Sequence, residues 1–196
     1  LATPKSVCKG FMTPDMMVVV DYEGKKLAGD RDASSELPMH LEVYRHRPDV
    51  NAVVHSHPPL CTGFAVAGIP LDRAVLAEVV TTLGSIPIAE YGTPSTREMA
   101  DTVRPLIKAH DALLLANHGA LTLGRDLFQA YYKMETIEHF AQISLVARQL
   151  EDAELVIVGA HEAFAAVEHF PLHAFEVLAH LDDVERAGLV DGGFQH

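Results

Sequence analysis

Three histidines stand at positions where they could hold a catalytic metal ion. His55 and His57 are two residues apart at the end of an apolar segment, so in an extended strand both imidazoles project from the same face. His118 follows a second apolar segment and precedes Gly119, whose missing side chain leaves room for a ligand. Three nitrogen ligands with an open position for water or substrate are typical of catalytic Zn²⁺, and of Co²⁺, Mn²⁺ or Fe²⁺ at similar sites.

The same histidines have plainer interpretations. A single histidine in an apolar strand is more often a hydrogen-bonded core residue than a ligand, and His-x-His pairs occur in proteins without metals. Sequence spacing alone does not bring His118 to the pair formed by His55 and His57. A structural zinc ion that ties two strands together is a further alternative, although such ions normally have four protein ligands.

The elements expected around these residues alternate between strands and helices. Short apolar runs predict strands, and apolar positions three or four residues apart predict helices. The predicted strands are 16–21 with a returning strand from 25, 50–57, 86–89, 112–117 and 121–124, the last of which extends its predecessor or pairs beside it. The predicted helices are 35–47, 59–67, 76–83, 96–110 and 127–150, while 155–158 is strand-like and 161–181 is helix-like. This alternation predicts a layered α/β domain.

The amino-acid composition limits the classes of protein to which the chain can belong. The 196 residues, 48% of them hydrophobic, suffice for one compact core, so we expect a single domain over 1–196. The formal net charge of −12 disfavours nucleic-acid binding. No apolar run approaches the roughly 20 residues that span a bilayer, so we expect no membrane partner. Cys8 and Cys61 are too few for a disulfide framework and predict reduced thiols in a cytoplasmic protein.

Several motifs occur in an order that resembles the class II aldolase and adducin family. The motifs are Ser34-Ser35-Glu36, Arg47-Pro48-Asp49-Val50, Val53-Val54-His55-Ser56-His57-Pro58, Tyr91-Gly92-Thr93-Pro94 and Asn117-His118-Gly119. The resemblance runs from about residue 3 to about residue 150, and residues 151–196 do not align with the family. It implies a three-layer α/β/α domain around a mostly antiparallel central sheet, assembled as a homo-oligomer, commonly a cyclic tetramer.

The resemblance also implies a metal site and a catalytic carboxylate. One divalent ion per chain would be held by His55, His57 and His118, with Zn²⁺ expected first and Mn²⁺, Co²⁺ or Fe²⁺ as alternatives. Glu36 falls on the position of the family's catalytic acid and base. Without the surrounding motif, a carboxylate at a helix start is an ordinary residue of the cap region.

Four residues match positions that hold the substrate's phosphate in the family. Ser34 and Ser35 would bind it through hydroxyls and N–H groups at a helix start, and N-capping of that helix is their plainer and compatible role. Lys5 and Ser6 occupy a loop that in the family usually contains Thr-Pro-Ser/Thr-Gly. The ammonium group of Lys5 would bind the phosphate by its charge, where the family uses backbone N–H groups. Alternatively, Lys5 would bind a different anion.

The chain departs from the family pattern at two further places. The early Gly-Asn segment that helps to hold phosphate is absent, which we interpret as truncation of the N-terminus. The tyrosine that assists the leaving aldehyde in the aldolases would fall near Leu76, and no tyrosine lies between Tyr44 and Tyr91. Glu78 is a nearby ionisable alternative whose plainer role is that of an exposed helix residue.

The predicted function is metal-dependent aldol cleavage of a ketose phosphate or related hydroxy-carbonyl compound through a metal-stabilised enediolate. A sugar-phosphate epimerase, a dehydratase or a decarboxylase would use the same site, and the sequence does not separate them. A non-catalytic, adducin-like assembly module belongs to a different class. Such a module need not keep the metal ligands, so the three histidines together with Glu36 favour the enzyme.

Overall fold

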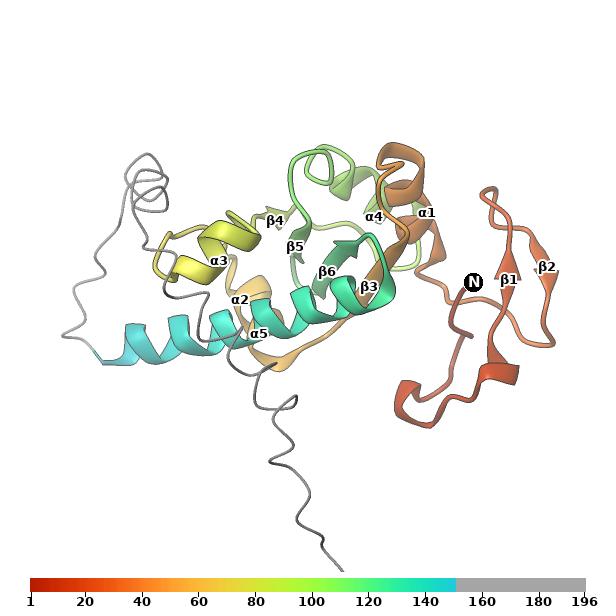
Figure 1. Cartoon of the computed structure of the whole chain (residues 1–196), viewed down its shortest axis with the longest axis horizontal. Coiled ribbons are helices and arrows are strands. Elements are labelled where there is room, and N and C mark those ends of the chain that lie inside the picture. The colour runs from red at the N-terminus through yellow and green to blue at the C-terminus, as the bar shows by residue number, and fades with distance from the viewer. Residues whose placement is uncertain (151–196) are drawn as a thin grey trace, which may run out of the picture. The chain divides into compact units, whose positions relative to one another are not determined.

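Four strands form a mixed sheet at the centre of residues 1–150, the part of the chain that the computed structural model describes (Figure 1). They are β3 (Ala52–Ser56), β4 (Ile88–Ala89), β5 (Ala112–Leu115) and β6 (Gly119–Gly124). The strand order is β3-β6-β5-β4, with β6 antiparallel to both of its neighbours and β4 parallel to β5. The predicted α/β class is confirmed, and the predicted segment 121–124 pairs beside its predecessor.

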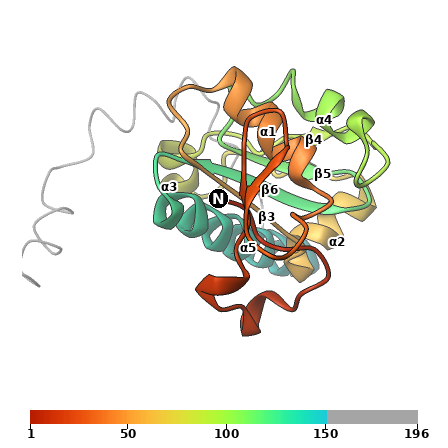
Figure 2. The ribbon, with the colours of Figure 1, turned by 90° about the vertical axis from the view of Figure 1, so that its right-hand side faces the viewer.

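One face of the sheet is covered by α1 (Leu37–His46) and α4 (Arg97–Val103), which lie on the same side of it in Figures 1 and 2. Leu113 and Leu115 of β5 point into this layer and are fully buried among side chains of both helices. Because successive strand residues face opposite sides of a sheet, the residue between them must enter a second core.

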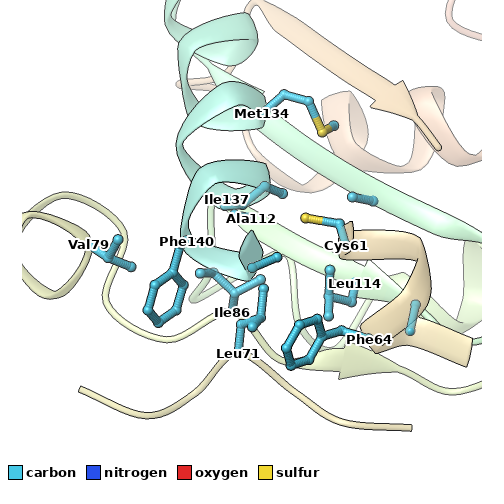
Figure 3. Close-up of a cluster of buried hydrophobic side chains, with 13 residues drawn as sticks. Cys61, Phe64, Leu71, Val79, Ile86, Ala112, Leu114, Met134, Ile137 and Phe140 are labelled. Atoms are coloured by element: carbon cyan, nitrogen blue, oxygen red, sulfur yellow. The ribbon is translucent and has the colours of Figure 1, made fainter. Parts of the chain in front are cut away.

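That second core lies between the sheet and the helices α2 (Pro59–Ala67), α3 (Ala77–Thr82) and α5 (Leu127–Gln149). Leu114 of β5 and Phe140 of α5 are both buried in it, as Figure 3 shows. Since both faces of β5 are covered, the strand is apolar throughout instead of alternating with polar residues.

Local capping signals explain where two of the helices begin and end. Pro59 occupies the first turn of α2, where its missing N–H costs no helical hydrogen bond, and Gly68 ends the helix with a left-handed backbone at φ 68°. The side chain of Asp126 accepts a 2.8 Å hydrogen bond from the Gln129 N–H at the start of α5. Both helices match their predicted ranges within one residue.

Helix α4 is shorter than the predicted helix 96–110. It spans Arg97–Val103, and isolated turns follow it as far as residue 109. Pro105 has no N–H to donate to the Asp101 carbonyl oxygen, so the helical hydrogen bonds are interrupted there, although Arg104 keeps a helical backbone. The amphipathic pattern continues past this proline, and the prediction of the last two turns was wrong because it neglected the proline.

The N-terminal segment forms a hairpin beside α1. Its strands are β1 (Val19–Val20) and β2 (Lys26–Ala28), which pair antiparallel. The first strand begins later than predicted because a short 3-10 turn, η2 (Pro14–Met16), occupies the start of the predicted range. Arg45 of α1 donates a 2.7 Å hydrogen bond to the carbonyl oxygen of Tyr22, which ties the hairpin turn to the helix.

Within residues 1–150, no helix is long and apolar enough to cross a membrane. The strand expected at 155–158 and the helix expected at 161–181 lie outside the described residues. The single-domain prediction for 1–196 extends into that part of the chain and stays a prediction.

Replacing Leu114 by alanine tests the second core. The side chain is fully buried, so truncation should lower the free energy of unfolding by about 2–5 kcal/mol. Leu127→Ala is the matched control, because this leucine is 63% exposed and its loss should change stability by less than about 0.5 kcal/mol. Urea titrations followed by circular dichroism measure both. Equal effects of the two substitutions would contradict the assignment of this core.

Candidate metal centre and active site

The pairing of β3 with β6 brings the three histidines together. The two strands are antiparallel, with His55 opposite Leu121, so β3 ends where β6 begins. His57 follows β3 and His118 precedes β6, which places them side by side. The ring centroid of His118 lies 4.8 Å from that of His55 and 4.8 Å from that of His57. One ligand atom from each histidine lies within 4.8 Å of the other two.

Gly119 is what allows this close approach. A Cβ atom at this position would lie 2.6 Å from Cδ2 of His57 and 2.6 Å from the carbonyl oxygen of Ser56. Both contacts are too short for any side chain. Asn117, two residues earlier, has a positive φ of 55°, a conformation that asparagine tolerates better than most residues. The turn between β5 and β6 therefore places His118 in close contact with the end of β3.

The nitrogen atoms of the cluster suit a divalent metal ion. His55 Nδ1 lies 2.9 Å from the carbonyl oxygen of Ala120, so this nitrogen carries the proton and donates, and Nε2 keeps its lone pair. The Nε2 atoms of His55 and His57 are 3.2 Å apart, close to the roughly 3.3 Å that separates two nitrogens on a tetrahedral zinc ion. Nδ1 of His118 is buried and has no hydrogen-bond partner among the described residues.

Burial also keeps two of these imidazoles neutral. Burial lowers the pKa of His55 to about 3. It also lowers the pKa of His118, although the negative charge of Glu36 offsets part of this lowering. Neutral imidazole is the form that binds a metal. His57 is exposed, while His55 and His118 are half-buried. A set of three imidazole nitrogens with one solvent-facing side fits an open, catalytic type of metal site better than a closed structural one.

Glu36 is the N-cap residue of α1 and lies close enough to His118 for its charge to act on that imidazole. Its Oε1 accepts a 2.9 Å hydrogen bond from the hydroxyl of Ser95, and its Oε2 is buried without a hydrogen-bond partner among residues 1–150. One oxygen is thus held in place and the other is available to exchange a proton.

Ser95 is a site residue that the sequence analysis missed. It has a left-handed backbone at φ 65°, in a loop where a Cβ on Gly92 would meet the Cα of Met99 at 2.8 Å. The close packing of Gly92 on α4 lets the loop carry Ser95 to the carboxylate of Glu36. The signal in the sequence was the Tyr91-Gly92-Thr93-Pro94 motif, which ends one residue before this serine.

His40 is a second residue that the sequence analysis did not assign. It follows Glu36 by four residues, so both lie on one face of α1. Its ring packs edge-on against His55, with centroids 6.5 Å apart and an interplanar angle of 79°. Burial lowers the pKa of His40 to about 4. Its neutral ring therefore packs against the first metal-ligand candidate. The spacing of four residues from Glu36 was the available signal.

The two serines have different surroundings. The Ser34 hydroxyl accepts a 3.3 Å hydrogen bond from the Glu36 N–H, while Ser35 is exposed. Neither residue is the N-cap of α1, because the helix begins at Leu37 and Glu36 itself holds the N-cap position. The N-capping role expected for the serines was wrong in position, although Ser34 does stabilise the turn that leads into the helix.

Lys5 and Ser6 lie on the segment that pairs with residues 32–34. The Lys5 N–H donates to the carbonyl oxygen of Asp32 at 2.9 Å, and Ser6 has a positive φ of 57°. Both side chains are exposed. The left-handed backbone at Ser6 explains why the family's loop favours glycine there.

The position that corresponds to the family's tyrosine lies at the start of α3. Leu76 is the N-cap residue of α3 and packs against the second core. Glu78 is exposed, and its backbone carbonyl accepts hydrogen bonds from Thr81 and Thr82. These contacts agree with the plainer role of Glu78 as an exposed helix residue.

The replacement Gly119→Ala tests the packing of the metal centre. The added methyl group would displace His57 from the other two histidines, so we expect affinity for Zn²⁺ to fall by about 10- to 100-fold. Gly63→Ala is the matched control, because a Cβ there meets nothing within 4 Å and alanine favours its helix. Calorimetric titration of the metal-free variants with Zn²⁺ measures the effect. Unchanged affinity in Gly119→Ala would contradict the proposed geometry.

Comparisons with known proteins agree with this geometry. The family model "Class II Aldolase and Adducin N-terminal domain" matches residues 1–145. An L-fuculose phosphate aldolase from Methanococcus maripaludis is 34% identical over 149 residues, which are 76% of this chain and 80% of that protein. A 3-oxo-tetronate 4-phosphate decarboxylase from Escherichia coli O6:H1 is 32% identical over 150 residues, 74% of this chain and 70% of that protein.

Among solved structures, an L-fuculose 1-phosphate aldolase superposes with a TM-score of 0.78 at 31% identity, covering 86% of this chain and 78% of that one. The crystal structure of an L-fuculose-1-phosphate aldolase from Thermus thermophilus superposes with a TM-score of 0.68 at 33% identity, covering 77% of this chain and 78% of that one. Sequence motifs, fold and both kinds of relative agree, and the chain therefore belongs to the class II aldolase and adducin family.

Proposed function

We propose that this chain is a metal-dependent lyase that cleaves a phosphorylated hydroxy-carbonyl compound. The observation that carries the proposal is the convergence of His55, His57 and His118 beside the carboxylate of Glu36. Membership of the class II aldolase and adducin family supports the same conclusion. A non-catalytic assembly module would have no need for converging imidazole nitrogens next to a carboxylate with one oxygen unpaired among residues 1–150.

The three histidines would hold one divalent ion per chain. Zn²⁺ is the ion we expect first, since it favours three imidazole nitrogens with one open position, and Mn²⁺, Co²⁺ or Fe²⁺ are the alternatives. When bound, such an ion supplies a Lewis acid that polarises the substrate's carbonyl group. His55 is oriented for this role through its hydrogen bond to the Ala120 carbonyl oxygen.

Glu36 would move the proton. The Ser95 hydroxyl orients the carboxylate by donating to Oε1, so proton exchange would take place at Oε2, which has no partner among the described residues. The carboxylate would accept a proton from the substrate's hydroxyl group as the carbon–carbon bond breaks. It would return that proton to the carbon left behind. Ser95 would keep the carboxylate in position without taking part in the transfer.

The anionic end of the substrate would bind at the N-terminal side of the site. Two of the relatives described above are an aldolase of L-fuculose phosphate and a decarboxylase of 3-oxo-tetronate 4-phosphate, and both names contain a phosphorylated compound. We propose a phosphorylated sugar or sugar acid as substrate. Ser34, Ser35, Lys5 and Ser6 are the residues proposed to face its phosphate group.

Decarboxylation is the second candidate reaction. Aldol cleavage requires a proton to leave the hydroxyl group that becomes the aldehyde, and no tyrosine stands near Leu76 to assist Glu36 in this transfer. Loss of carbon dioxide from a carboxylate involves no such hydroxyl group, so the missing tyrosine is compatible with a decarboxylase. A similarity of 32% identity to a decarboxylase supports this alternative. An epimerase or a dehydratase on the same site is kept as a weaker alternative.

Other features expected from the family belong to the proposal as well. We propose a homo-oligomer, with a tetramer favoured, and a cytoplasmic location. We also propose the family's three-layer arrangement around a mostly antiparallel sheet for the complete domain. The sheet of residues 1–150 is consistent with it, having helices on both faces, two antiparallel pairings and one parallel pairing.

Substitution of Glu36 by glutamine tests the function. The zinc-loaded parent should cleave L-fuculose 1-phosphate or decarboxylate 3-oxo-tetronate 4-phosphate. Glu36→Gln should slow that reaction by about 100- to 10,000-fold while the metal content stays unchanged. The control is Glu23→Gln, on the exposed hairpin turn, which should turn over at the parent's rate.

Two results would contradict this assignment. Full activity in Glu36→Gln would remove the proton-transfer role of this carboxylate. Inactivity of the metal-loaded parent on both phosphorylated substrates would remove the lyase proposal, and an epimerase, a dehydratase or an assembly module would take its place.

A further inference from the structure

The N-terminal segment lies directly against the chain that leads into Glu36. The Ser34 N–H donates to the carbonyl oxygen of Thr3 at 2.9 Å, and Pro4 forms an antiparallel bridge with Ala33. The Ser34 hydroxyl in turn accepts from the Glu36 N–H. Two hydrogen bonds, both made by Ser34, therefore connect Thr3 to Glu36, the proposed catalytic residue.

Lys9 folds back over this segment. It begins the 3-10 turn η1 (Lys9–Phe11), and its Nζ donates a 3.0 Å hydrogen bond to the hydroxyl of Thr3, six residues earlier. The backbone reversal around Ser6, with its positive φ, makes this return possible. Hydrogen bonds thus connect Lys9 to Thr3, Thr3 to Ser34 and Ser34 to Glu36. The ammonium group of Lys9 lies at one end of this series.

The charge of Lys9 is not neutralised by a neighbouring carboxylate. Its partner is a neutral hydroxyl, and no carboxylate among residues 1–150 lies within salt-bridge distance of Nζ. One of its three N–H donors is used by Thr3, and two are left.

Lys5 differs from Lys9 in this respect. Its backbone N–H is bonded to Asp32, and its exposed side chain has no hydrogen bond to any described residue that would fix the ammonium group. A flexible surface lysine loses side-chain entropy when it binds an anion, whereas Lys9 is already held. The formal net charge of −12 repels an anionic substrate, so one positioned cation matters more than it would in a neutral protein.

We propose that Lys9, more than Lys5, is the specificity-determining cation that binds the phosphate monoester of the substrate, with Thr3 and Ser34 beside it. This assignment rests on the proposed function. Two free ammonium donors would form charge-assisted hydrogen bonds to phosphate oxygens, which are stronger than bonds to a neutral hydroxyl. Lys9 would then discriminate a phosphorylated compound from its neutral counterpart before any bond is broken.

The experiment measures binding apart from turnover. Glycerol 3-phosphate is a phosphate monoester that lacks a carbonyl group, and glycerol is its neutral counterpart. Both are titrated calorimetrically into the zinc-loaded parent and into Lys9→Met, Lys9→Arg, Lys5→Met and Lys25→Met. Lys25 is exposed on the hairpin turn and serves as the matched control for the loss of one positive charge.

The parent should bind glycerol 3-phosphate and not glycerol. Lys9→Met should weaken binding of the ester by about 10- to 100-fold, and Lys9→Arg should retain most of it. Lys5→Met should weaken binding less than Lys9→Met does, and Lys25→Met should stay within about threefold of the parent. In turnover, Lys9→Met should raise KM with little change in kcat. Melting temperatures should stay unchanged, because the Lys9 side chain is exposed.

Three results would overturn the inference: no binding of the ester by the parent, parent-like binding by Lys9→Met, or a loss in Lys5→Met as large as that in Lys9→Met. Failure of the proposed function has a different signature. In that case binding of the ester would depend on Lys9 while neither phosphorylated substrate was turned over.

Discussion

The antiparallel pairing of β3 with β6 is the constraint on which the site depends. In this register, β3 ends where β6 begins, and the two histidines at the end of one strand meet the histidine before the other. Because side chains alternate along a strand, a slip of one residue would turn His55 to the opposite face of the sheet. The apolar residues of β6 fix the register, since Leu121 and Leu123 belong to one core and Ala120 to the other.

The electrostatics of the site follow from its place at the edge of this sheet. Burial keeps His55 and His40 neutral, while the carboxylate of Glu36 and the ammonium of Lys9 are ionisable groups at the two ends of one hydrogen-bonded series. The carboxylate lies beside the metal-ligand candidates, and the ammonium lies at the far end of a chain of hydrogen bonds. A substrate with a carbonyl group at one end and a phosphate at the other would meet suitable partners at both.

Part of the fold and of the site could be predicted from local sequence patterns. The period of two along an extended strand placed His55 and His57 on one face, and the flanking Pro59 and Gly68 marked the bounds of α2. The convergence of His118 on that pair came from family resemblance, because spacing in the sequence carries no information on which strand ends meet. Pro105 was a local signal too, and neglecting it made α4 too long.

The residues that were missed depend on tertiary contacts. Ser95 reaches Glu36 only through a positive φ and the close packing of Gly92, and Lys9 reaches Thr3 only because the chain reverses between them. Neither residue stands in a periodic pattern. His40 was within reach of a helical argument, since it shares a face of α1 with Glu36, but its contact with His55 requires the packing of α1 beside β3.

Metal content is the most direct measure of the central claim, that three histidines form a catalytic metal site. Elemental analysis of the purified parent should find about one divalent ion per chain, and His55→Ala, folded by circular dichroism, should have lost it. Chelation should abolish activity without unfolding the parent. A parent that contains no metal and binds none when Zn²⁺ is added, or a His55→Ala variant that retains a full complement, would contradict the account.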